Sequence, residues 1–255
     1  MERNRSSQSV GDYEKMEKSV LGNKAQERSI QSFYDSFWAG YAVKESRDSL
    51  RARLIKPYLN GSGINILDAG CGRGLLTYLM SNFCAKNLIV GTDISKEACK
   101  IAHQAIPRKN VEFVAADLAH LPFKQSSFGF VVFSEVIEHV PYEERMKVLH
   151  ELRNAIASRG YLFFTMPNPI HIVILLRKIL NRISRTRIAI SDQIFDDPPT
   201  LRSLIKLFND SAFTLKFLTF FDYTTGTRVK LRLPKLSVSA IQVIAIVSPS
   251  SEKKS

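Results

Sequence analysis

Cysteine is scarce in this chain, and long apolar runs are absent. Only Cys71, Cys84 and Cys99 occur among the 255 residues. Three cysteines are too few for a disulfide framework, and they lack the paired C-x-x-C spacing of a zinc site. We therefore expect no metal site and a protein of the reducing cytoplasm.

The sequence also lacks the features of a membrane or secreted protein. It begins with the polar stretch MERNRSSQSVGDYEKMEKS, which has no apolar core of the kind that a signal peptide needs. No segment reaches the ~20 apolar residues that span a bilayer. We expect a soluble protein that is at most peripheral to a membrane.

Acidic residues are outnumbered by basic ones. The chain has 36 Lys and Arg residues against 24 Asp and Glu residues, a formal net charge of +12. This excess favours anionic partners such as nucleic acid, acidic lipid head groups or phosphorylated substrates. It is equally typical of a solvated basic surface, so charge alone selects no partner.

What the chain does contain is a regular alternation of apolar runs and helical segments. Such an alternation predicts a parallel sheet with helices on both faces. We predict a doubly wound, mostly parallel seven-stranded sheet whose last strand is antiparallel. The predicted strands cover 64–69, 87–93, 111–117, 128–135, 161–167, 213–223 and 236–248.

The predicted helices follow from start and stop signals. One covers 75–85, one begins at the cap Ser95 and ends at Ala105, one runs from Pro141 to Ala157, and one covers 201–210 after Thr200.

One domain accounts for most of the chain. We expect disordered tails at 1–28 and 249–255, a single domain over 29–248, and a substrate-side insertion or lid at 170–200. An aromatic helix around Tyr34, Trp38 and Tyr41 precedes the first strand. It either folds over a ligand or packs on the sheet.

The main chemical signal is Asp68-Ala69-Gly70-Cys71-Gly72-Arg73-Gly74, which lies between a strand and a helix. Glycines let the backbone turn sharply and approach a ligand closely. An acid beside the first glycine suits a cationic ligand, whereas it would repel the pyrophosphate of a dinucleotide.

Two further acids end the next two strands, at Asp93 and Asp117. Parallel sheets bind ligands at the carboxyl ends of their strands, where Asp93 can accept ribose hydroxyls and Asp117 an adenine amino group. Ile94 and Leu118 would supply apolar walls for the ring. Either acid could instead simply cap the helix or turn that follows it.

The segments ILDAGCGRG, GTDIS, AADLAHLPF and VVFSEVIEHV resemble the successive motifs of class I S-adenosylmethionine-dependent methyltransferases. The resemblance covers 64–168 and is nearest to the small-molecule branch that includes ubiquinone and menaquinone methyltransferases. It implies a Rossmann-like methyltransferase fold with S-adenosyl-L-methionine as cofactor.

The resemblance also implies roles for individual residues. Gly70 and Cys71 would approach the methionine part, Asp93 would hold the ribose, Asp117 with Leu118 would frame the adenine, and Ser134 would lie near the sulfonium. Gly72 belongs to the same turn.

The sequence departs from the family at two places. Gly129 stands where an Asp is usual, and Ala157-Ser158-Arg159-Gly160 replaces a Lys-Pro-Gly-Gly turn.

Titratable groups follow the fourth predicted strand in SEVIEHV. Glu135 and His139 are four residues apart, so on a helix they would share a face. We expect one of them to deprotonate or hydrogen-bond an acceptor hydroxyl. The alternative is that Glu138 and His139 end the turn and contact backbone.

Residues 170–190 are both apolar and basic, with five Arg or Lys residues after Leu176 and no acid. Such a segment suits a helix lying on an anionic membrane surface, or a lid over a greasy substrate. A buried helix with a solvated basic end would show the same pattern.

The leading function is therefore O- or C-methylation of a small, hydrophobic, lipid-like acceptor. The alternatives are an RNA or protein methyltransferase and a non-catalytic cofactor-binding scaffold. Against nucleic acid, Ser134-Glu135-Val136-Ile137 stands where base-amine methylating relatives carry an N-P-P-Y-like motif. Glycine spacing and Asp68 disfavour an NAD-dependent dehydrogenase. The sequence leaves the acceptor and the oligomeric state open.

Overall fold

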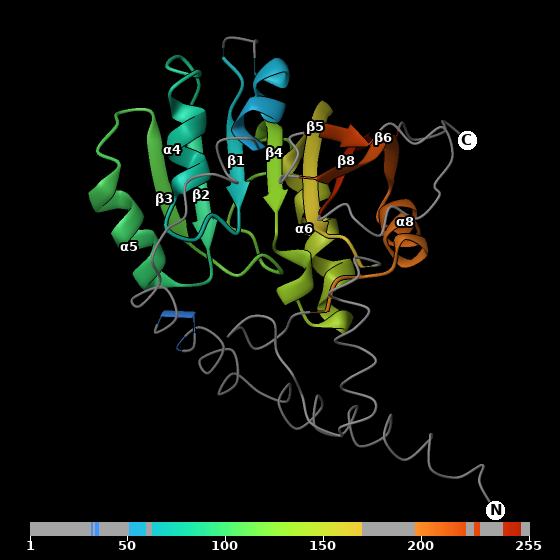
Figure 1. The fold of residues 1–255 in the computed structure, drawn as a ribbon. Coiled ribbons are helices and arrows are strands. Elements are labelled where there is room, and N and C mark those ends of the chain that lie inside the picture. Colours follow the sequence, from blue (N-terminus) through green and yellow to red (C-terminus); the bar gives the residue numbers. More distant parts are fainter. Residues whose placement is uncertain are drawn as a thin grey trace, which may run out of the picture.

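The order of the strands defines the architecture. A computed structural model describes residues 32, 34–35, 51–59, 63–169, 197–222, 227–229 and 242–250. In this part of the chain one sheet has the order β3-β2-β1-β4-β5-β8-β6-β7 (Figure 1). The predicted tail 1–28, Trp38, Tyr41 and the basic segment 170–190 lie outside the described residues.

The sheet confirms the predicted fold class. β1 to β5 are parallel, and β8 is antiparallel to its neighbours β5 and β6. A three-residue strand, β7, adds an eighth member at the edge to the seven that we predicted. The strands are β1 (Ile66–Ala69), β2 (Ile89–Asp93), β3 (Val111–Ala115), β4 (Phe128–Ser134), β5 (Ile156–Pro167), β6 (Phe213–Asp222), β7 (Thr227–Val229) and β8 (Gln242–Pro249).

Two helices begin at the predicted caps. The Ser95 hydroxyl accepts the Ala98 N–H at 3.0 Å and starts α5 (Lys96–Ala105), while Thr200 accepts the Ser203 N–H at 3.2 Å and starts α8 (Leu201–Asp210). No described helix has the length and apolar content needed to cross a membrane.

Two other helices are shorter than predicted. α4 (Leu75–Ser81) ends early because the N–H groups of Asn82 and Phe83 bond three residues back, which tightens and closes its last turn. Pro141 precedes the 3-10 turn η3 (Tyr142–Glu144), so α6 (Arg145–Ala155) begins four residues later.

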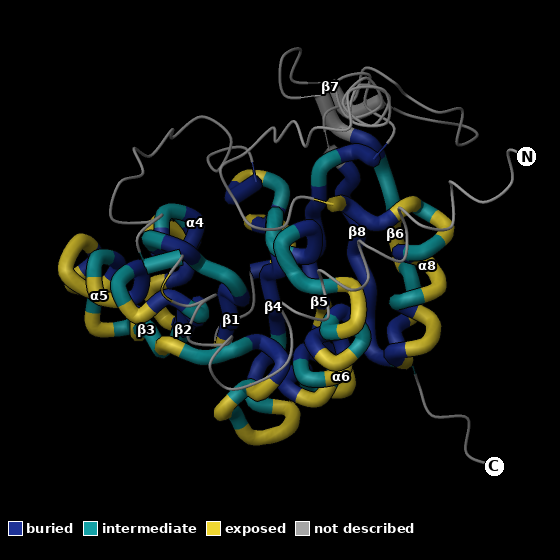
Figure 2. Tube along the Cα trace, turned by 90° about the horizontal axis from the view of Figure 1, so that it is seen from below, coloured by how far each residue is buried: buried dark blue, intermediate teal, exposed yellow. Residues whose placement is uncertain are grey.

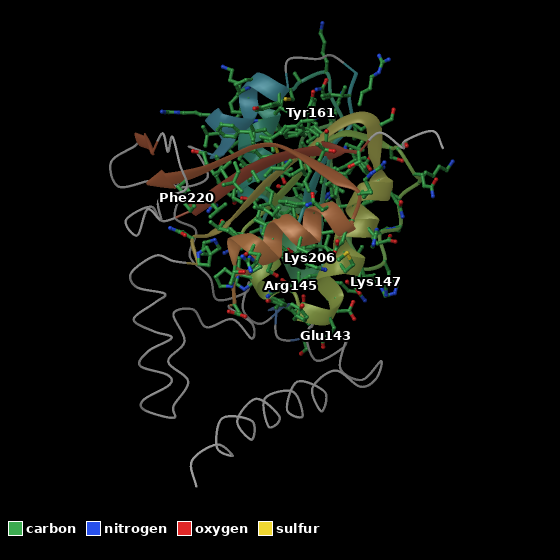
Figure 3. The ribbon with its side chains drawn as sticks, turned by 90° about the vertical axis from the view of Figure 1, so that its right-hand side faces the viewer. Glu143, Arg145, Lys147, Tyr161, Lys206 and Phe220 are labelled. Atoms are coloured by element: carbon green, nitrogen blue, oxygen red, sulfur yellow. The ribbon has the colours of Figure 1, made fainter. Side chains whose placement is uncertain are left out.

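The two sheet faces carry separate cores, because successive side chains of a strand alternate between faces. Ile66 and Phe130 pack with Met80 of α4 and with Ile55, which precedes the 3-10 turn η1 (Lys56–Tyr58). On the other face, Leu67 and Ala69 of β1 and Val131 of β4 pack in one core with residues of α6 and α8. Figure 2 shows the strands buried between these layers, and Figure 3 shows α8 beside α6, with exposed Lys147 and Lys206.

Both departures from the family pattern lie together at the amino ends of β4 and β5. Residues 157–160 belong to β5, which follows α6 without a loop, and they form an irregularity in the pairing between Phe128 and Phe130. A Cβ on Gly160 would come within 2.8 Å of the Gly129 carbonyl oxygen. Glycine at 160 therefore lets β5 pass close to β4.

Candidate functional site

The polar residues that we singled out meet at the carboxyl edge of the sheet, which is the lower edge in Figure 1. β1 lies between β2 and β4, where the strand order reverses, and open α/β sheets bind ligands at this crevice. Alternation along the strands places Asp68, Asp93 and Ser134 on the same face as Ile66, Ile89 and Phe130, which is the face covered by α4.

The glycine turn after β1 has a left-handed backbone at Gly70, Gly72 and Gly74, with φ of 77°, 52° and 77°. A Cβ on Gly70 would lie 2.4 Å from Val136, and one on Gly74 would lie 2.9 Å from Phe113. We expected the glycines to make room for a ligand. At Gly70 and Gly74 the space is filled by the protein's own side chains.

The N–H groups of this turn are used inside the protein. Those of Gly70 and Cys71 both donate to the Thr92 carbonyl, at 2.8 and 2.9 Å, and that of Gly74 donates to Cys71. The Gly72 N–H donates to Asp93 at 2.8 Å. The edge therefore presents carboxylates and carbonyls, which favour a ligand rich in donors and positive charge over a pyrophosphate.

The carboxylates of Asp68 and Asp93 are both buried at this edge. Asp68 accepts the Thr77 hydroxyl at 2.5 Å, and Asp93 accepts the Gly72 and Ser95 N–H groups. Each carboxylate oxygen of Asp93 has two lone pairs, so its contacts with the two N–H groups leave room for a ligand donor. Burial raises the pKa of Asp93, and the hydrogen bonds from Ser95 and Gly72 oppose that rise.

Cys71 contributes a neutral thiol to the site. Burial raises its pKa well above the usual value, helped by a hydrogen bond with Cys99 and by the negative charge of Asp93 and Asp68. A thiol of this kind stays protonated and unreactive at neutral pH.

The three residues predicted to contact the adenine, Asp117, Leu118 and Ile94, differ in where their side chains lie. Asp117 is partly exposed and accepts the Ala119 N–H at 2.9 Å, with His120 Nδ1 3.1 Å from its other oxygen. The side chain of Leu118 packs in the core on the α6 and α8 face, whereas Ile94 is half-buried directly after β2. Leu118 is thus a core residue, and its side chain does not form the apolar wall that we predicted.

Asp35 is a site residue that the sequence analysis missed. Its Oδ1 accepts the Ser95 hydroxyl and, at 3.0 Å, the Glu97 N–H, so it adds a second cap to α5. The contact brings the helical residues 34–35 beside Asp93, below the sheet in Figure 1. No local sequence signal links Asp35 to a cap 60 residues away.

The turn after β4 differs from the predicted helix. Glu135 has φ of 58°, and only the 3-10 turn η2 (Ile137–His139) follows, so Glu135 and His139 do not share an α-helical face. The Glu135 carboxylate accepts the Thr165 hydroxyl at 2.9 Å and lies 3.6 Å from Arg51 Nη2. Contacts with remote residues outweigh the helical spacing of SEVIEHV.

The η2 turn is held from the α6 and α8 side of the molecule. Buried Arg145, labelled in Figure 3, donates to the Val140 carbonyl at 3.0 Å and to the Asp197 carbonyl at 2.7 Å. The Asp197 N–H donates to the Glu138 carbonyl. Within this frame His139 Nε2 lies 3.8 Å from the buried Glu138 carboxylate.

Comparison with known proteins shows a methyltransferase domain match over part of the chain. Residues 67–164 match the family described as Methyltransferase domain. A demethylmenaquinone methyltransferase of Lactococcus lactis is 29% identical over 154 residues, which cover 58% of this chain and 60% of that protein. A tRNA U34 carboxymethyltransferase of Campylobacter curvus is 30% identical over 135 residues, or 51% of this chain and 41% of that protein.

The structural comparison agrees. The crystal structure of an S-adenosylmethionine-dependent methyltransferase of Methanosarcina mazei, 21% identical, superposes with a TM-score of 0.61 over 78% of this chain and 98% of that chain. The chain spans 41% to 60% of the length of the curated relatives that it matches. The structural similarity confirms the predicted fold, and the match over residues 67–164 agrees with the predicted resemblance to S-adenosylmethionine-dependent methyltransferases.

Proposed function

We propose that this protein transfers a methyl group from S-adenosylmethionine to a small, hydrophobic acceptor. One observation carries the cofactor assignment: all three glycine N–H groups of the turn after β1 donate within the protein, and two buried carboxylates lie on one face of the sheet beside it. An edge of acceptors fits the ammonium, hydroxyl and sulfonium groups of this cofactor.

Each of the predicted site residues binds a different part of the cofactor. Asp68, with the turn at Gly70–Gly72, faces the methionine part, Asp93 holds the ribose hydroxyls, and Asp117 accepts the adenine amino group. The bound cofactor supplies a methyl group already activated by a sulfonium, so the protein's task is to align the acceptor and exclude water.

Glu138 and His139 form the acid–base pair of this proposal. Glu138 Oε1 lies 3.8 Å from His139 Nε2, an ion-pair distance at which the buried carboxylate attracts a protonated imidazole. Glu135, the other candidate from the sequence, has its two oxygens engaged by Thr165 and Arg51, and an ion-paired carboxylate is a weak base.

A small acceptor is favoured by the demethylmenaquinone methyltransferase relative, and an RNA acceptor by the tRNA-modifying relative. We favour the small acceptor because Ser134-Glu135-Val136-Ile137, and no N-P-P-Y-like motif, follows β4. The anionic membrane contact proposed for 170–190 remains a prediction, to be tested by vesicle flotation at low salt.

Calorimetry on the full chain tests the cofactor assignment. S-adenosylmethionine and S-adenosylhomocysteine should bind and NAD should not; heat with NAD alone would overturn the assignment. A mass-spectrometric screen for metabolites that gain a methyl group then identifies the acceptor. With that acceptor, His139→Gln and Glu138→Gln should slow transfer while leaving cofactor affinity unchanged, whereas full activity in both would remove the acid–base role.

A further inference from the structure

A chain of polar groups joins the carboxyl ends of β4 and β5. Ser134 Oγ lies 2.8 Å from Thr165 Oγ1, and the two residues are paired across the strands. The Thr165 hydroxyl donates to Glu135 Oε1 at 2.9 Å, and Glu135 Oε2 lies 3.6 Å from Arg51 Nη2. Arg51 is buried, so the chain is anchored by a charge inside the protein.

Proton counting fixes the direction of these hydrogen bonds. A hydroxyl has one proton and two lone pairs, an ionised carboxylate only accepts, and arginine is permanently charged. Thr165 gives its proton to Glu135, whose other oxygen faces Arg51. The Thr165 oxygen must therefore accept the proton of Ser134.

Ser134 is thereby left with lone pairs alone for any further partner. It is half-buried, and it lies on the same edge and face as Asp68. Its neighbour Phe133 pairs with Ala69, which places Ser134 beside the start of the glycine turn. A lone pair at this point attracts a positive charge without adding a net charge of its own.

We propose that Arg51, Glu135 and Thr165 orient the Ser134 hydroxyl so that its lone pairs face the sulfonium, and that the protein thereby binds S-adenosylmethionine in preference to S-adenosylhomocysteine. This rests on the proposed function. Ser134 contacts the ligand, whereas Thr165 and Glu135 are positioning residues. The preference has a use, because the product of methyl transfer is uncharged and is released more readily.

The same geometry predicts whether loss of the Ser134 hydroxyl affects cofactor binding or the rate of methyl transfer. The sulfonium charge diminishes as the methyl group leaves, so a lone pair directed at it stabilises bound substrate at least as much as the transition state. Loss of this interaction should therefore weaken cofactor binding without lowering the rate at saturating cofactor.

The test is calorimetry with S-adenosylmethionine, S-adenosylhomocysteine and sinefungin, whose protonated amine replaces the sulfonium. Ser134→Ala should lower affinity for the two cationic ligands by about tenfold, with little change for the neutral one. Thr165→Val should lower it by about threefold, because the Ser134 proton is released and the oxygen is no longer pre-oriented. Thr165→Ser should restore the wild-type ratio.

The matched control is Thr214→Val. Thr214 on β6 also bonds a serine hydroxyl, Ser250 at 2.9 Å, at an exposed site. In Thr214→Val the ratio of the affinities for S-adenosylmethionine and S-adenosylhomocysteine should equal the wild-type ratio. An unchanged ratio in Thr165→Val, with both ligands still binding, overturns the inference alone. If neither ligand binds the wild type, the proposed function itself fails.

Discussion

The turns after β1 and after β4 lie side by side at one edge of the sheet, and both need a left-handed backbone. The first provides it with Gly70, Gly72 and Gly74. The second provides it with Glu135 at φ of 58°, a conformation that costs a residue with a side chain about 1–2 kcal/mol. The first turn is thus set by the absence of side chains, and the second by the contacts of one side chain.

The difference indicates that the conformation of the second turn depends on the side chain of Glu135. A glycine at 135 would remove the backbone strain, yet the sequence retains a carboxylate that reaches Thr165 and Arg51. Strain that persists beside a ligand site is typically maintained by surrounding contacts. Substitutions at Gly70 and Glu135, each with a matched control, separate backbone conformation from side-chain contact in these turns.

The largest effect is expected from Gly70→Ala. Its Cβ would lie 2.4 Å from Val136 in addition to the strain at φ of 77°, so the free energy of unfolding should fall by about 3 kcal/mol. Gly63→Ala is the matched control: φ is 83° but no atom lies within 4 Å of the Cβ, and about 1 kcal/mol is expected.

Denaturant unfolding measures both variants. Adding Val136→Ala to Gly70→Ala should recover the part of the unfolding free energy that is lost to the clash with Val136. The part lost to the strained backbone of residue 70 should remain. Equal losses in the two single variants would mean that Val136 does not constrain the turn.

A smaller effect is expected from Glu135→Gly. If φ alone mattered, glycine would stabilise the protein; we instead expect a loss of about 1–2 kcal/mol because buried Arg51 loses its counter-ion. Glu135→Gln should lose less, since its amide oxygen can still accept the Thr165 hydroxyl.

Ser126→Gly supplies the control for the backbone. Ser126 also has φ of 58° but is exposed, so glycine there should be neutral or stabilising by up to about 1 kcal/mol. A Glu135→Gly protein that is as stable as Ser126→Gly would show that the side-chain contacts do not hold the second turn.

The smallest effect is expected from Asp93→Asn, and it depends on pH. Because burial raises the folded-state pKa of Asp93, the folded state binds its proton more tightly than the unfolded state does. The stability from this group is complete below the unfolded pKa and is lost as pH rises through the folded value.

Asp93→Asn removes that dependence, so the stability of the variant relative to wild type should rise as pH goes from about 4 to about 7. Thermal unfolding at several pH values measures this. Parallel pH profiles for the two proteins would contradict the raised pKa. Cofactor affinity should fall in the variant at every pH, since an amide offers one accepting oxygen where the carboxylate has two.

The sequence predicted most of the sheet because each parallel strand is a continuous apolar run and each following helix begins with a local signal. Ser95 and Thr200 are examples, since a cap and its N–H partner lie three residues apart. Asp93 was predicted as an acid that ends a strand, and Asp68 as the acid that precedes the glycine turn.

The remainder depended on residues distant in sequence. The spacing of Glu135 and His139 suggests a helix, but Thr165, 30 residues later, and Arg51 determine the backbone of Glu135. Asp35 caps α5 from 60 positions away. Local patterns carry no information about such pairs, so the glycine turn was predictable and the Glu135 turn was not.

The irregular pairing near Gly129 and Gly160 has a consequence for length variation. It lies at the amino ends of the same two strands whose carboxyl ends hold Ser134 and Thr165, and regular pairing runs from Phe130 opposite Tyr161 to that pair. A residue inserted within 157–160 would be absorbed locally. One inserted after Tyr161 would turn Thr165 to the opposite face. Homologues with β5 of different length should therefore carry their insertions before Tyr161 and not after it.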